Sequence, residues 1–481
     1  MPYLPVSRRL INFTYIRPEA IAEYATLSEG DKNAVDGLHA DTEPLNGDSQ
    51  LIDRDAMWRS KMHALWIIFK AGRTAERQSV FDQFKADCGS DLEAYATWCL
   101  CYDKWGAPNG EESNWERKFN RNSPEIANLR KQYPDTLDFY RWLEWIAAEQ
   151  LSSAQQAAKD AGMHIGIMSD MAVGVHPSGA DVWWNPERFA KGATVGAPPD
   201  MFNQQGQNWS QPPLSPINLE TTGYEAYRNM VHGMFARAGA VRIDHILGLF
   251  RLWWIPENRS AMDGAYVYYD SDIMLGVLAI EASRAGGVVV GEDLGVVPDH
   301  VADSLSSHGI LGCAVEWFEQ CDGVFRAPSQ WRPYALASVN THDLPPAAGY
   351  LEYEHVKIRE RLGLLTGRPR IRASPRPSRM RCWPCWSSRV IFDADFAEHR
   401  EDHEADIVDA LYHALKGSPC KLLAASITDA VGEKRAQNQP GTNNEYPNWR
   451  IPLADAKGNV VPLETLFDTP GAQRFAQIFN S

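Results

Sequence analysis

Three short apolar segments of this 481-residue chain each end in, or are followed by, charged residues and histidines. In chain order, these residues are Arg242, Asp244 and His245, then Glu292, then His342 and Asp343. In a barrel of parallel strands surrounded by helices, side chains at the carboxyl ends of the strands point into an open mouth and carry the chemistry. The sequence therefore predicts a site that gathers several carboxylates at the ends of strands.

The three acids suit the cleavage of an acetal. That reaction needs one acid to protonate the leaving oxygen and a second carboxylate to meet the positive charge that develops on the sugar carbon. Arg242 lies two residues before Asp244, on the same face of a strand, where it would keep that carboxylate ionised and aimed. Glu292 follows a run of valines, and a partly desolvated carboxyl there would have the raised pKa of a proton donor.

Two other interpretations of these residues stay open at this point. A single acid at a strand end is more often a salt-bridged or capping residue than a catalytic one, although three such acids together favour catalysis. Metal-assisted chemistry would be expected to show an HExxH motif or comparable ligand spacing, which this sequence lacks. His245 and His342 each adjoin one of the acids, and we expect them to hydrogen-bond sugar hydroxyls.

The segments around these residues alternate between strand and helix patterns, which predicts parallel βα units. Residues 164–168 form a predicted strand with Asp170 just beyond its end, where the acid either joins the site or caps a turn. Helices are predicted over residues 224–238 and 271–285, each leading into one of the acid-bearing strands. The sequence therefore predicts an α/β fold.

Longer segments separate these units. Residues 53–160 carry apolar side chains at spacings of three and four, which predicts a helical insertion. Residues 27–52 are polar and rich in Gly and Asp, so we expect an exposed connection there. Residues 174–218 are rich in Pro, Gly, Trp and Asn, and they predict a long loop of the kind that is usually functional.

Composition and charge narrow the class of partner. The net charge of −15 argues against nucleic acid, which needs a basic face on the protein. No segment has the apolar length of a signal peptide or a membrane span, so we expect a cytoplasmic protein without a membrane partner. The eight cysteines are too sparse for a disulfide scaffold, and the CxxC spacing of Cys382 and Cys385 has no second ligand pair. The 17 tryptophans and 17 tyrosines fit stacking on sugar rings, although most aromatic side chains fill cores.

Several motifs together resemble one family. They are Val241-Arg-Ile-Asp-His245, Arg251-Leu-Trp-Trp-Ile-Pro256, Val290-Gly-Glu-Asp-Leu-Gly295, Thr341-His-Asp-Leu-Pro345, Gly196-Ala-Pro-Pro-Asp200, Gly206-Gln-Asn-Trp209, Asn438-Gln-Pro-Gly-Thr442 and Asn448-Trp-Arg450. Over nearly its whole length the chain resembles the 4-alpha-glucanotransferases called amylomaltases or disproportionating enzymes. The resemblance implies a (β/α)8 TIM-type barrel with helical insertions, as a single catalytic domain over residues 1–481.

The resemblance also implies an activity and the residues that perform it. The activity would be retaining transfer, by double displacement, of α-1,4-glucan segments from a donor maltooligosaccharide to the 4-hydroxyl of an acceptor glucose or glucan, with no metal or organic cofactor. Asp244 would be the nucleophile, Glu292 the acid and then the base, and Asp343 the residue that binds and distorts the sugar. The implied substrate-binding residues are Tyr3, Asp170, Asp200, Trp209 and Asn438 near the donor, Tyr266 in a loop on the acceptor side, and Arg242, His245 and His342 as orienting groups.

The sequence departs from the family pattern at two places. Family members begin before the position of Met1, so the barrel is expected to lack its first βα unit. Residues 367–389 are rich in Arg and Pro where the family has an amphipathic helix, and we interpret them as a local frameshift in the gene or its sequencing, or else as a basic, disordered surface loop. The alternative functions are an inactive or only sugar-binding remnant, and an α-glucan hydrolase that uses the same acids.

Overall fold

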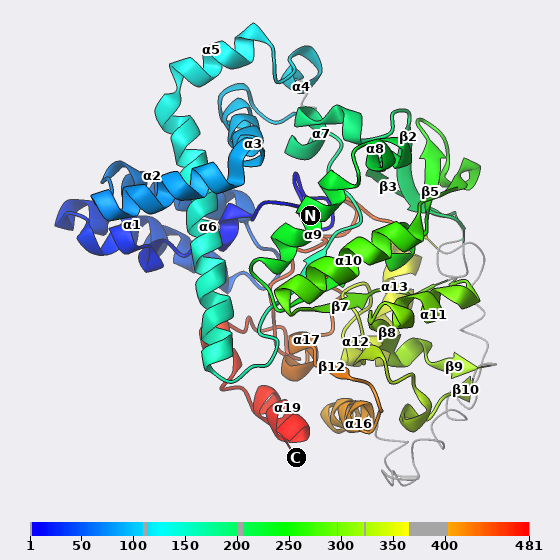
Figure 1. The fold of residues 1–481 in the computed structure, drawn as a ribbon. Coiled ribbons are helices and arrows are strands. Elements are labelled where there is room, and N and C mark those ends of the chain that lie inside the picture. Colours follow the sequence, from blue (N-terminus) through cyan, green and yellow to red (C-terminus); the bar gives the residue numbers. More distant parts are fainter. Residues whose placement is uncertain are drawn as a thin grey trace. The chain divides into compact units, whose positions relative to one another are not determined.

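The computed structural model describes residues 2–108, 113–199, 205–295, 297–321, 324–364 and 403–480. These residues form two compact units, one of Met1–Thr42 with Asp55–Ile310 and one of Glu43–Arg54 with Leu311–Ser481 (Figure 1). The Arg- and Pro-rich segment 367–389, with Cys382 and Cys385, lies outside the described residues. No helix in the described part of the chain is both long enough and apolar enough to cross a membrane.

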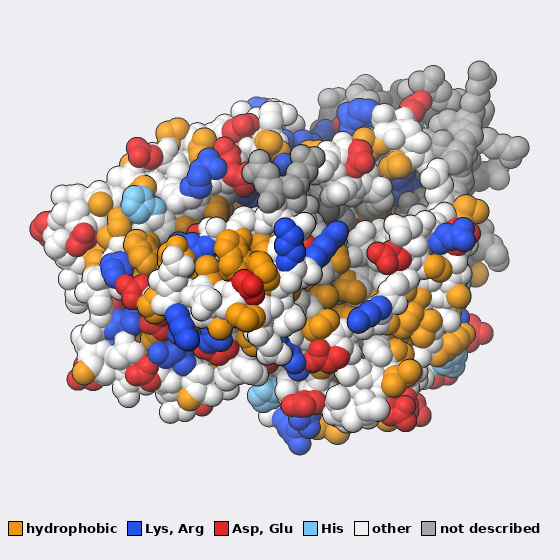
Figure 2. All heavy atoms as spheres, turned by 90° about the horizontal axis from the view of Figure 1, so that it is seen from above, with side chains coloured by type: hydrophobic (Ala, Val, Ile, Leu, Met, Phe, Trp, Pro, Cys, Tyr) orange, Lys and Arg blue, Asp and Glu red, His pale blue; other side chains and the backbone are white. Residues whose placement is uncertain are grey.

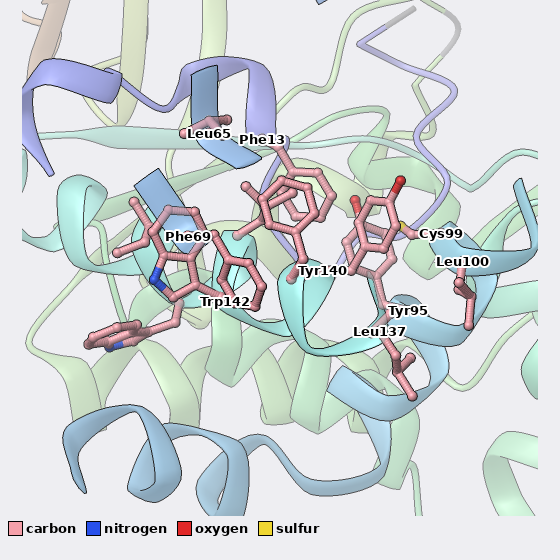
Figure 3. Close-up of a cluster of buried hydrophobic side chains, with 14 of the residues drawn as sticks. Phe13, Leu65, Phe69, Tyr95, Cys99, Leu100, Leu137, Tyr140 and Trp142 are labelled. Atoms are coloured by element: carbon pink, nitrogen blue, oxygen red, sulfur yellow. The ribbon is translucent and has the colours of Figure 1, made fainter. Parts of the chain in front are cut away.

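All regular elements in the described part of residues 55–160 are helices. They are α2 (Arg54–Lys70), α3 (Ala75–Trp105), α4 (Trp115–Lys118), α5 (Pro124–Gln132) and α6 (Pro134–Asp160). On α6, the side chains of Trp142, Leu143 and Ile146 are completely buried, because this face of the helix packs on the aromatic core that α3 also joins. Figure 3 shows this core, in which the ring centroids of Phe69 and Trp142 lie 5.6 Å apart. It contains none of the described site candidates, so its aromatic residues are structural.

The segment 27–52, predicted to be an exposed connection, is mostly exposed, but it contains helix α1 (Glu29–Thr42), which was not predicted. Ser28 Oγ accepts a hydrogen bond from the backbone N–H of Asp31 at 3.1 Å and so caps the helix. Val35 is the one buried residue of α1. Because only one residue of this helix is buried, its sequence shows no apolar periodicity.

A buried acid anchors the N-terminal segment of the first unit to α6. Glu144 is fully buried, and its two carboxylate oxygens accept the backbone N–H of Ile11 at 3.0 and 3.1 Å. Burial raises the pKa of Glu144 to about 8, although the hydrogen bond from Ile11 opposes the rise. This contact holds the end of the segment that begins with the predicted site residue Tyr3.

Three parallel strands carry most of the predicted chemistry of the first unit. Their order is β1 (Met168–Met171), β4 (Ala240–Ile243) and β7 (Val288–Gly291). Helices α9 (Glu225–Phe235) and α10 (Ser271–Ala285) precede β4 and β7 respectively, and they pack against each other (Figure 1). Parallel strands need such crossover helices, so the predicted βα units are present.

Strand β1 starts later than predicted. Residues 164–168 were predicted as the strand, but a side chain takes the place of a neighbouring strand there: Gln155 donates to the carbonyl of Ile165 at 2.9 Å and accepts from the N–H of Ile167 at 2.6 Å. The strand therefore begins at Met168, and Asp170 lies within it, opposite Arg242 of β4. The prediction that Asp170 follows the strand was wrong.

The region 174–218, predicted to be one long loop, contributes two strands to a four-stranded antiparallel sheet. Its order is β3 (Gln207–Gln211), β2 (Ala193–Ala197), β5 (Arg251–Pro256) and β6 (Ala265–Tyr268), and the same region also holds helices α7 (Ala180–Trp184) and α8 (Pro216–Thr221). Strands β2 and β3 are short, and the polar β3 pairs with β2, which in turn pairs with the apolar β5. A Cβ at Gly196 would collide with the carbonyl of Gln207, so glycine permits this close pairing.

The second unit contains another parallel sheet, in the order β12 (Leu422–Ala424), β11 (Ala335–Ser338) and β8 (Gly312–Val315). Its other elements are the hairpin of β9 (Gln320–Cys321) and β10 (Val324–Phe325), and helices α12 (Ala347–Leu351), α13 (Glu354–Arg361), α16 (Glu404–Lys416), α17 (Ile427–Val431), α18 (Leu463–Leu466) and α19 (Pro470–Asn480). Helix α19 packs on both α16 and α17. The rings of Tyr412 and Phe475 meet in this packing, with centroids 4.3 Å apart.

Replacing Gly471 by Ala is expected to destabilise the second unit. A Cβ at this position would overlap the carbonyl of Ala430, so α19 would have to move away from α17. Overpacking of this kind costs about 1–3 kcal/mol. Urea unfolding should show the loss, while Gly276→Ala in α10, where the added Cβ meets no atom within 4 Å, should be neutral or stabilising. Equal unfolding midpoints for Gly471→Ala and the parent chain would contradict this interpretation of the contact.

Candidate active site

Two of the predicted acids follow neighbouring strands of the first unit. Asp244 comes directly after β4 and Glu292 directly after β7, and these strands pair in parallel. The backbone N–H of Asp244 donates to the carbonyl of Met171 at 3.0 Å, and that of Glu292 donates to the carbonyl of Ile243 at 2.9 Å. The ladder of backbone hydrogen bonds thus continues through both acids and fixes where their side chains start.

Arg242 joins two carboxylates. Its Nη1 donates to both oxygens of Asp170, at 2.7 and 3.0 Å, and to Oδ1 of Asp244 at 3.1 Å. The predicted contact between Arg242 and Asp244 is therefore present. Burial acts to lower the pKa of Arg242, but the charges of Asp170 and Asp244 outweigh it and raise that pKa above its usual range. The guanidinium stays charged and favours the ionised form of Asp244.

Tyr3 extends this hydrogen-bonded group. Its hydroxyl donates to Oδ2 of Asp170 at 2.5 Å, and burial together with the charge of Asp170 raises the pKa of the phenol well above its usual range. The side-chain amide of Gln211 donates to the backbone carbonyl of Tyr3 at 2.7 Å and holds the residue in place. Gln211 was not predicted as a site residue, because a glutamine at the end of a polar strand shows no sign of being buried.

Glu292 is held by two backbone donors. Its Oε2 accepts from the N–H of His245 at 2.9 Å, and its Oε1 accepts from the N–H of Leu294 at 2.7 Å. Burial nevertheless raises the pKa of Glu292, against the lowering effect of these bonds and of Arg242. This is the direction predicted from the valines that precede it. A carboxyl with a raised pKa is suited to hold a proton for donation, as a general acid must.

His245 adopts an unusual backbone conformation. Its φ of 48° and ψ of 64° place it in the left-handed region, which is uncommon for a residue other than glycine. This conformation accompanies the bond from its N–H to Glu292. Burial lowers the pKa of the imidazole to about 4, so the ring is neutral at pH 7. The ring meets Trp209 edge-on with centroids 5.4 Å apart, which brings a further predicted site residue to the group.

A cavity of the first unit reaches Asp244 and His245 from one side. Arg8 also lines it, and Nη1 of Arg8 donates to the carbonyls of Ala172 and Val173 at 3.1 and 2.7 Å. The remaining lining residues are Met171, Val173, Val195, Pro212, Pro213, Leu214, Tyr227, Met230, Ile243, Gly248, Leu249, Leu252, Tyr269 and Met274. Because most of this wall is apolar, the charge of Asp244 interacts more strongly with neighbouring charges than it would in water.

Tyr266 lies in strand β6, so the prediction that it lies in a loop was wrong. Its strand is short and pairs with β5, and that pairing is not visible in the local sequence. The ring of Tyr266 meets Trp253 at a centroid distance of 5.0 Å, and the guanidinium of Arg251 lies 4.0 Å from its centroid. Asp200, another predicted residue, lies outside the described residues.

The second unit brings together its own predicted residues. Strand β11 ends at Ser338, so His342 and Asp343 lie in the loop beyond the strand and not at its last residue. Asn438 donates through Nδ2 to Oδ1 of Asp343 at 2.7 Å, and Nε2 of His342 lies 3.4 Å from Oδ2 of the same carboxylate. Trp449 packs on the ring of His342 with centroids 5.2 Å apart. It was not a predicted site residue, although the motif Asn448-Trp-Arg450 contains it.

Among the described residues, no group of three or more His, Cys, Asp or Glu side chains is arranged to hold a metal ion. The described groups are instead two hydrogen-bonded clusters. One joins Tyr3, Asp170, Arg242 and Asp244 in the first unit, and the other joins His342, Asp343 and Asn438 in the second.

Comparison with known proteins gives the family. A family model described as 4-alpha-glucanotransferase matches residues 1–457. The chain belongs to this family. A 4-alpha-glucanotransferase of Mycobacterium tuberculosis is 44% identical over 482 residues, which cover 99% of this chain and 66% of that protein. The corresponding protein of Haemophilus influenzae is 29% identical over 494 residues, covering 98% of this chain and 69% of its own length.

Solved structures of the family agree with the fold. The crystal structure of amylomaltase from Corynebacterium glutamicum matches with a TM-score of 0.88 and 39% identity, covering 99% of this chain and 67% of that one. Amylomaltase from Streptococcus agalactiae in complex with acarbose matches with a TM-score of 0.75 at 16% identity, covering 99% of this chain and 88% of that one, and so shows the fold alone. These likenesses confirm the predicted α/β fold of the TIM-barrel type. The chain spans 66% of the length of the mycobacterial relative.

Proposed function

We propose that this chain transfers α-1,4-glucan segments from a donor maltooligosaccharide to the 4-hydroxyl of an acceptor glucose or glucan, with retention of configuration. The observation that carries the proposal is the pairing of two unlike carboxyl groups on adjacent strands. Asp244 bonds to the charged Arg242, whereas burial raises the pKa of Glu292. A nucleophilic carboxylate and a carboxyl group that serves as acid and then base are what a retaining glycosyl transfer requires. Membership of the 4-alpha-glucanotransferase family supports it.

In the first step, protonated Glu292 gives its proton to the glycosidic oxygen of the leaving sugar. The carboxylate of Asp244 attacks the anomeric carbon from the opposite face, and the bond to the leaving oxygen breaks as the bond to Asp244 forms. Arg242 keeps Asp244 ionised and aimed by its hydrogen bond of 3.1 Å. The product is a glycosyl-enzyme ester and a shortened glucan with a free 4-hydroxyl.

In the second step, ionised Glu292 takes the proton from the 4-hydroxyl of the acceptor. The acceptor oxygen attacks the anomeric carbon, and the bond to Asp244 breaks. Two inversions at one carbon restore the original configuration. The backbone donors of His245 and Leu294 hold Glu292 in place for both proton transfers.

The other predicted residues take binding roles in this proposal. Asp343, which Asn438 and His342 orient, binds and distorts the sugar at the cleaved bond. Tyr3, Asp170, Trp209, Asn438 and Asp200 bind donor sugars, and Tyr266 lies on the acceptor side. The neutral imidazole of His245 can hydrogen-bond a sugar hydroxyl.

Charge and composition support a neutral partner. The net charge is −15, and basic and acidic side chains are interspersed over the face shown in Figure 2. Nucleic acid would require clustered basic residues. We therefore propose α-glucans as the substrates, with neither nucleic acid nor a membrane as a partner. We also propose a cytoplasmic location.

Incubation of the purified chain with maltotriose tests the proposal. We expect glucose together with maltopentaose and longer oligomers, separated by chromatography, and we expect none of these products with Asp244→Asn. Glucose and maltose without longer oligomers would favour an α-glucan hydrolase, because water would then replace the acceptor. A cooperatively folded chain that turns over no maltotriose would favour the sugar-binding remnant.

A further inference from the structure

Asp429 contacts both ends of the loop that carries His342 and Asp343. The side-chain amide of Asn340 donates to Oδ2 of Asp429 at 2.8 Å, and the backbone N–H of Ala347 donates to Oδ1 at 2.6 Å. Asn340 comes just after β11, and Ala347 is the first residue of α12. A single carboxylate therefore closes the loop 340–347 at its base.

A third donor fixes the carboxylate itself. The hydroxyl of Tyr412, from α16, donates to Oδ2 of Asp429 at 2.6 Å and accepts the backbone N–H of Ser426 at 3.1 Å. Asp429 is 5% exposed and Tyr412 is completely buried. A buried carboxylate with three donors has a defined orientation, because any rotation would leave a donor unsatisfied.

The loop between these two ends is restricted by its own sequence. Pro345 and Pro346 precede α12 and fix their own φ angles, and the N–H of Leu344 bonds to the carbonyl of Thr341 at 3.2 Å. Between the two ends lies the short stretch around His342 and Asp343, where the N–H of Asp343 donates to Oγ1 of Thr341 at 3.3 Å and Asn438 bonds to the carboxylate. Its position depends on where Asn340 and Ala347 are held.

We infer that Asp429 is a positioning residue, whose carboxylate clamps the loop 340–347 so that Asp343 is presented to the sugar in one orientation. It does not touch substrate. The inference rests on the proposed function for the role of Asp343, but the clamp itself is a property of the loop. Helix α17, which carries Asp429, is held by α19 at the close contact between Gly471 and Ala430, so the clamp has a rigid base.

The ionised form of Asp429 makes the clamp, because a carboxylate can accept all three hydrogen bonds and a protonated carboxyl must donate one of its own. Burial raises the pKa of Asp429 to about 6, although Tyr412, Ala347 and Asn340 oppose the rise. The titratable groups that face this cluster are Tyr412 of α16 and Glu316 after β8. Glu316 is 1% exposed, and burial raises its pKa well above the usual value.

Hydrogen exchange of the loop, measured by mass spectrometry on the full chain, tests the clamp without any substrate. Protection of the Ala347 amide, corrected for the intrinsic effect of pH on exchange, should fall as the pH is lowered through about 6. Asp429→Asn should remove this step, because an amide does not titrate there. Tyr412→Phe should move the midpoint to higher pH, because it removes a hydrogen bond that favours the carboxylate. Asp468→Asn, at an exposed acid of the same unit, should behave like the parent chain.

Kinetics with maltotriose give the second readout. Asp429→Asn should lower kcat by about 10- to 100-fold with a much smaller change in KM, as expected when a reacting group is slightly misplaced. The clamp is refuted if the exchange step persists in Asp429→Asn, or if Tyr412→Phe leaves the midpoint unchanged. If the exchange results are as expected but the parent chain transfers no glucan, the proposed function fails and the clamp stands.

Discussion

Asp244→Ala is expected to abolish transfer from maltotriose and to be rescued by azide with inverted stereochemistry. Removing a covalent nucleophile costs on the order of 10⁴- to 10⁶-fold in kcat. With α-maltotriosyl fluoride as donor, the leaving group needs no protonation, so azide can enter the space left by the carboxylate. It would attack the face opposite the fluoride and give β-maltotriosyl azide. The anomer can be read directly by NMR of the isolated product.

The structure predicts that this variant keeps its fold. Arg242 stays paired with Asp170 through bonds of 2.7 and 3.0 Å, so removing Asp244 leaves no buried cation unpaired. Asp272→Ala, at an exposed acid in the first turn of α10, is the matched control and should retain the parent activity without azide. An α-configured azide from Asp244→Ala would show that another group forms the covalent intermediate.

The pairing of Asp244 with Glu292 could be predicted because it depends on local sequence. Each acid follows a short run of apolar residues, and the carboxyl ends of parallel strands meet at one edge of a sheet. The contact of Arg242 with Asp244 follows from the two-residue period of a strand, and the raised pKa of Glu292 from the valines before it. These features need only the strand itself and its immediate neighbours.

Features that depend on distant partners could not be predicted. Strand β1 starts at Met168 because the side chain of Gln155, on α6, occupies the backbone groups of Ile165 and Ile167. Strands β2 and β3 form because β5 pairs with β2. No pattern within residues 164–168 or 174–218 reports either contact. Helix α1 could not be predicted from apolar periodicity, because only one of its residues is buried.

Positioning residues escaped prediction for a different reason. Gln211 and Asp429 act through other residues, and neither lies in a motif of charged side chains at a strand end. The role of His245 was only partly predictable, because its contact with Glu292 is made by the backbone N–H and not by the imidazole. The sequence shows which side chain is present, but this contact is made by the backbone N–H of His245, whose φ angle is 48°.

Glu292→Gln is expected to lower transfer from maltotriose by about 10²- to 10⁴-fold, the usual contribution of general acid–base catalysis. The acid must be protonated for the first step, so the active form lies below the pKa of Glu292. Because burial raises that pKa, the parent chain should keep its activity to higher pH than an ordinary carboxyl would allow, and then lose it as the pH rises through that pKa. With α-maltotriosyl fluoride as donor, the variant should form the glycosyl-enzyme without an acid. The rate of glycosyl-enzyme formation should therefore not fall as the pH rises.

Azide separates the role of Glu292 from that of Asp244. In Glu292→Gln the nucleophile is intact, so azide would attack the glycosyl-enzyme and needs no base to do so. The second inversion would give α-maltotriosyl azide, the opposite anomer from that of Asp244→Ala. Glu257→Gln, at an exposed acid after β5, should match the parent chain in rate and in pH profile. A β-configured azide, or maltotriose transfer within tenfold of the parent, would assign the acid to another group. Burial and two backbone donors distinguish Glu292 from Asp244 at the ends of β7 and β4. The β-azide from Asp244→Ala and the α-azide from Glu292→Gln would together assign the nucleophile and the acid.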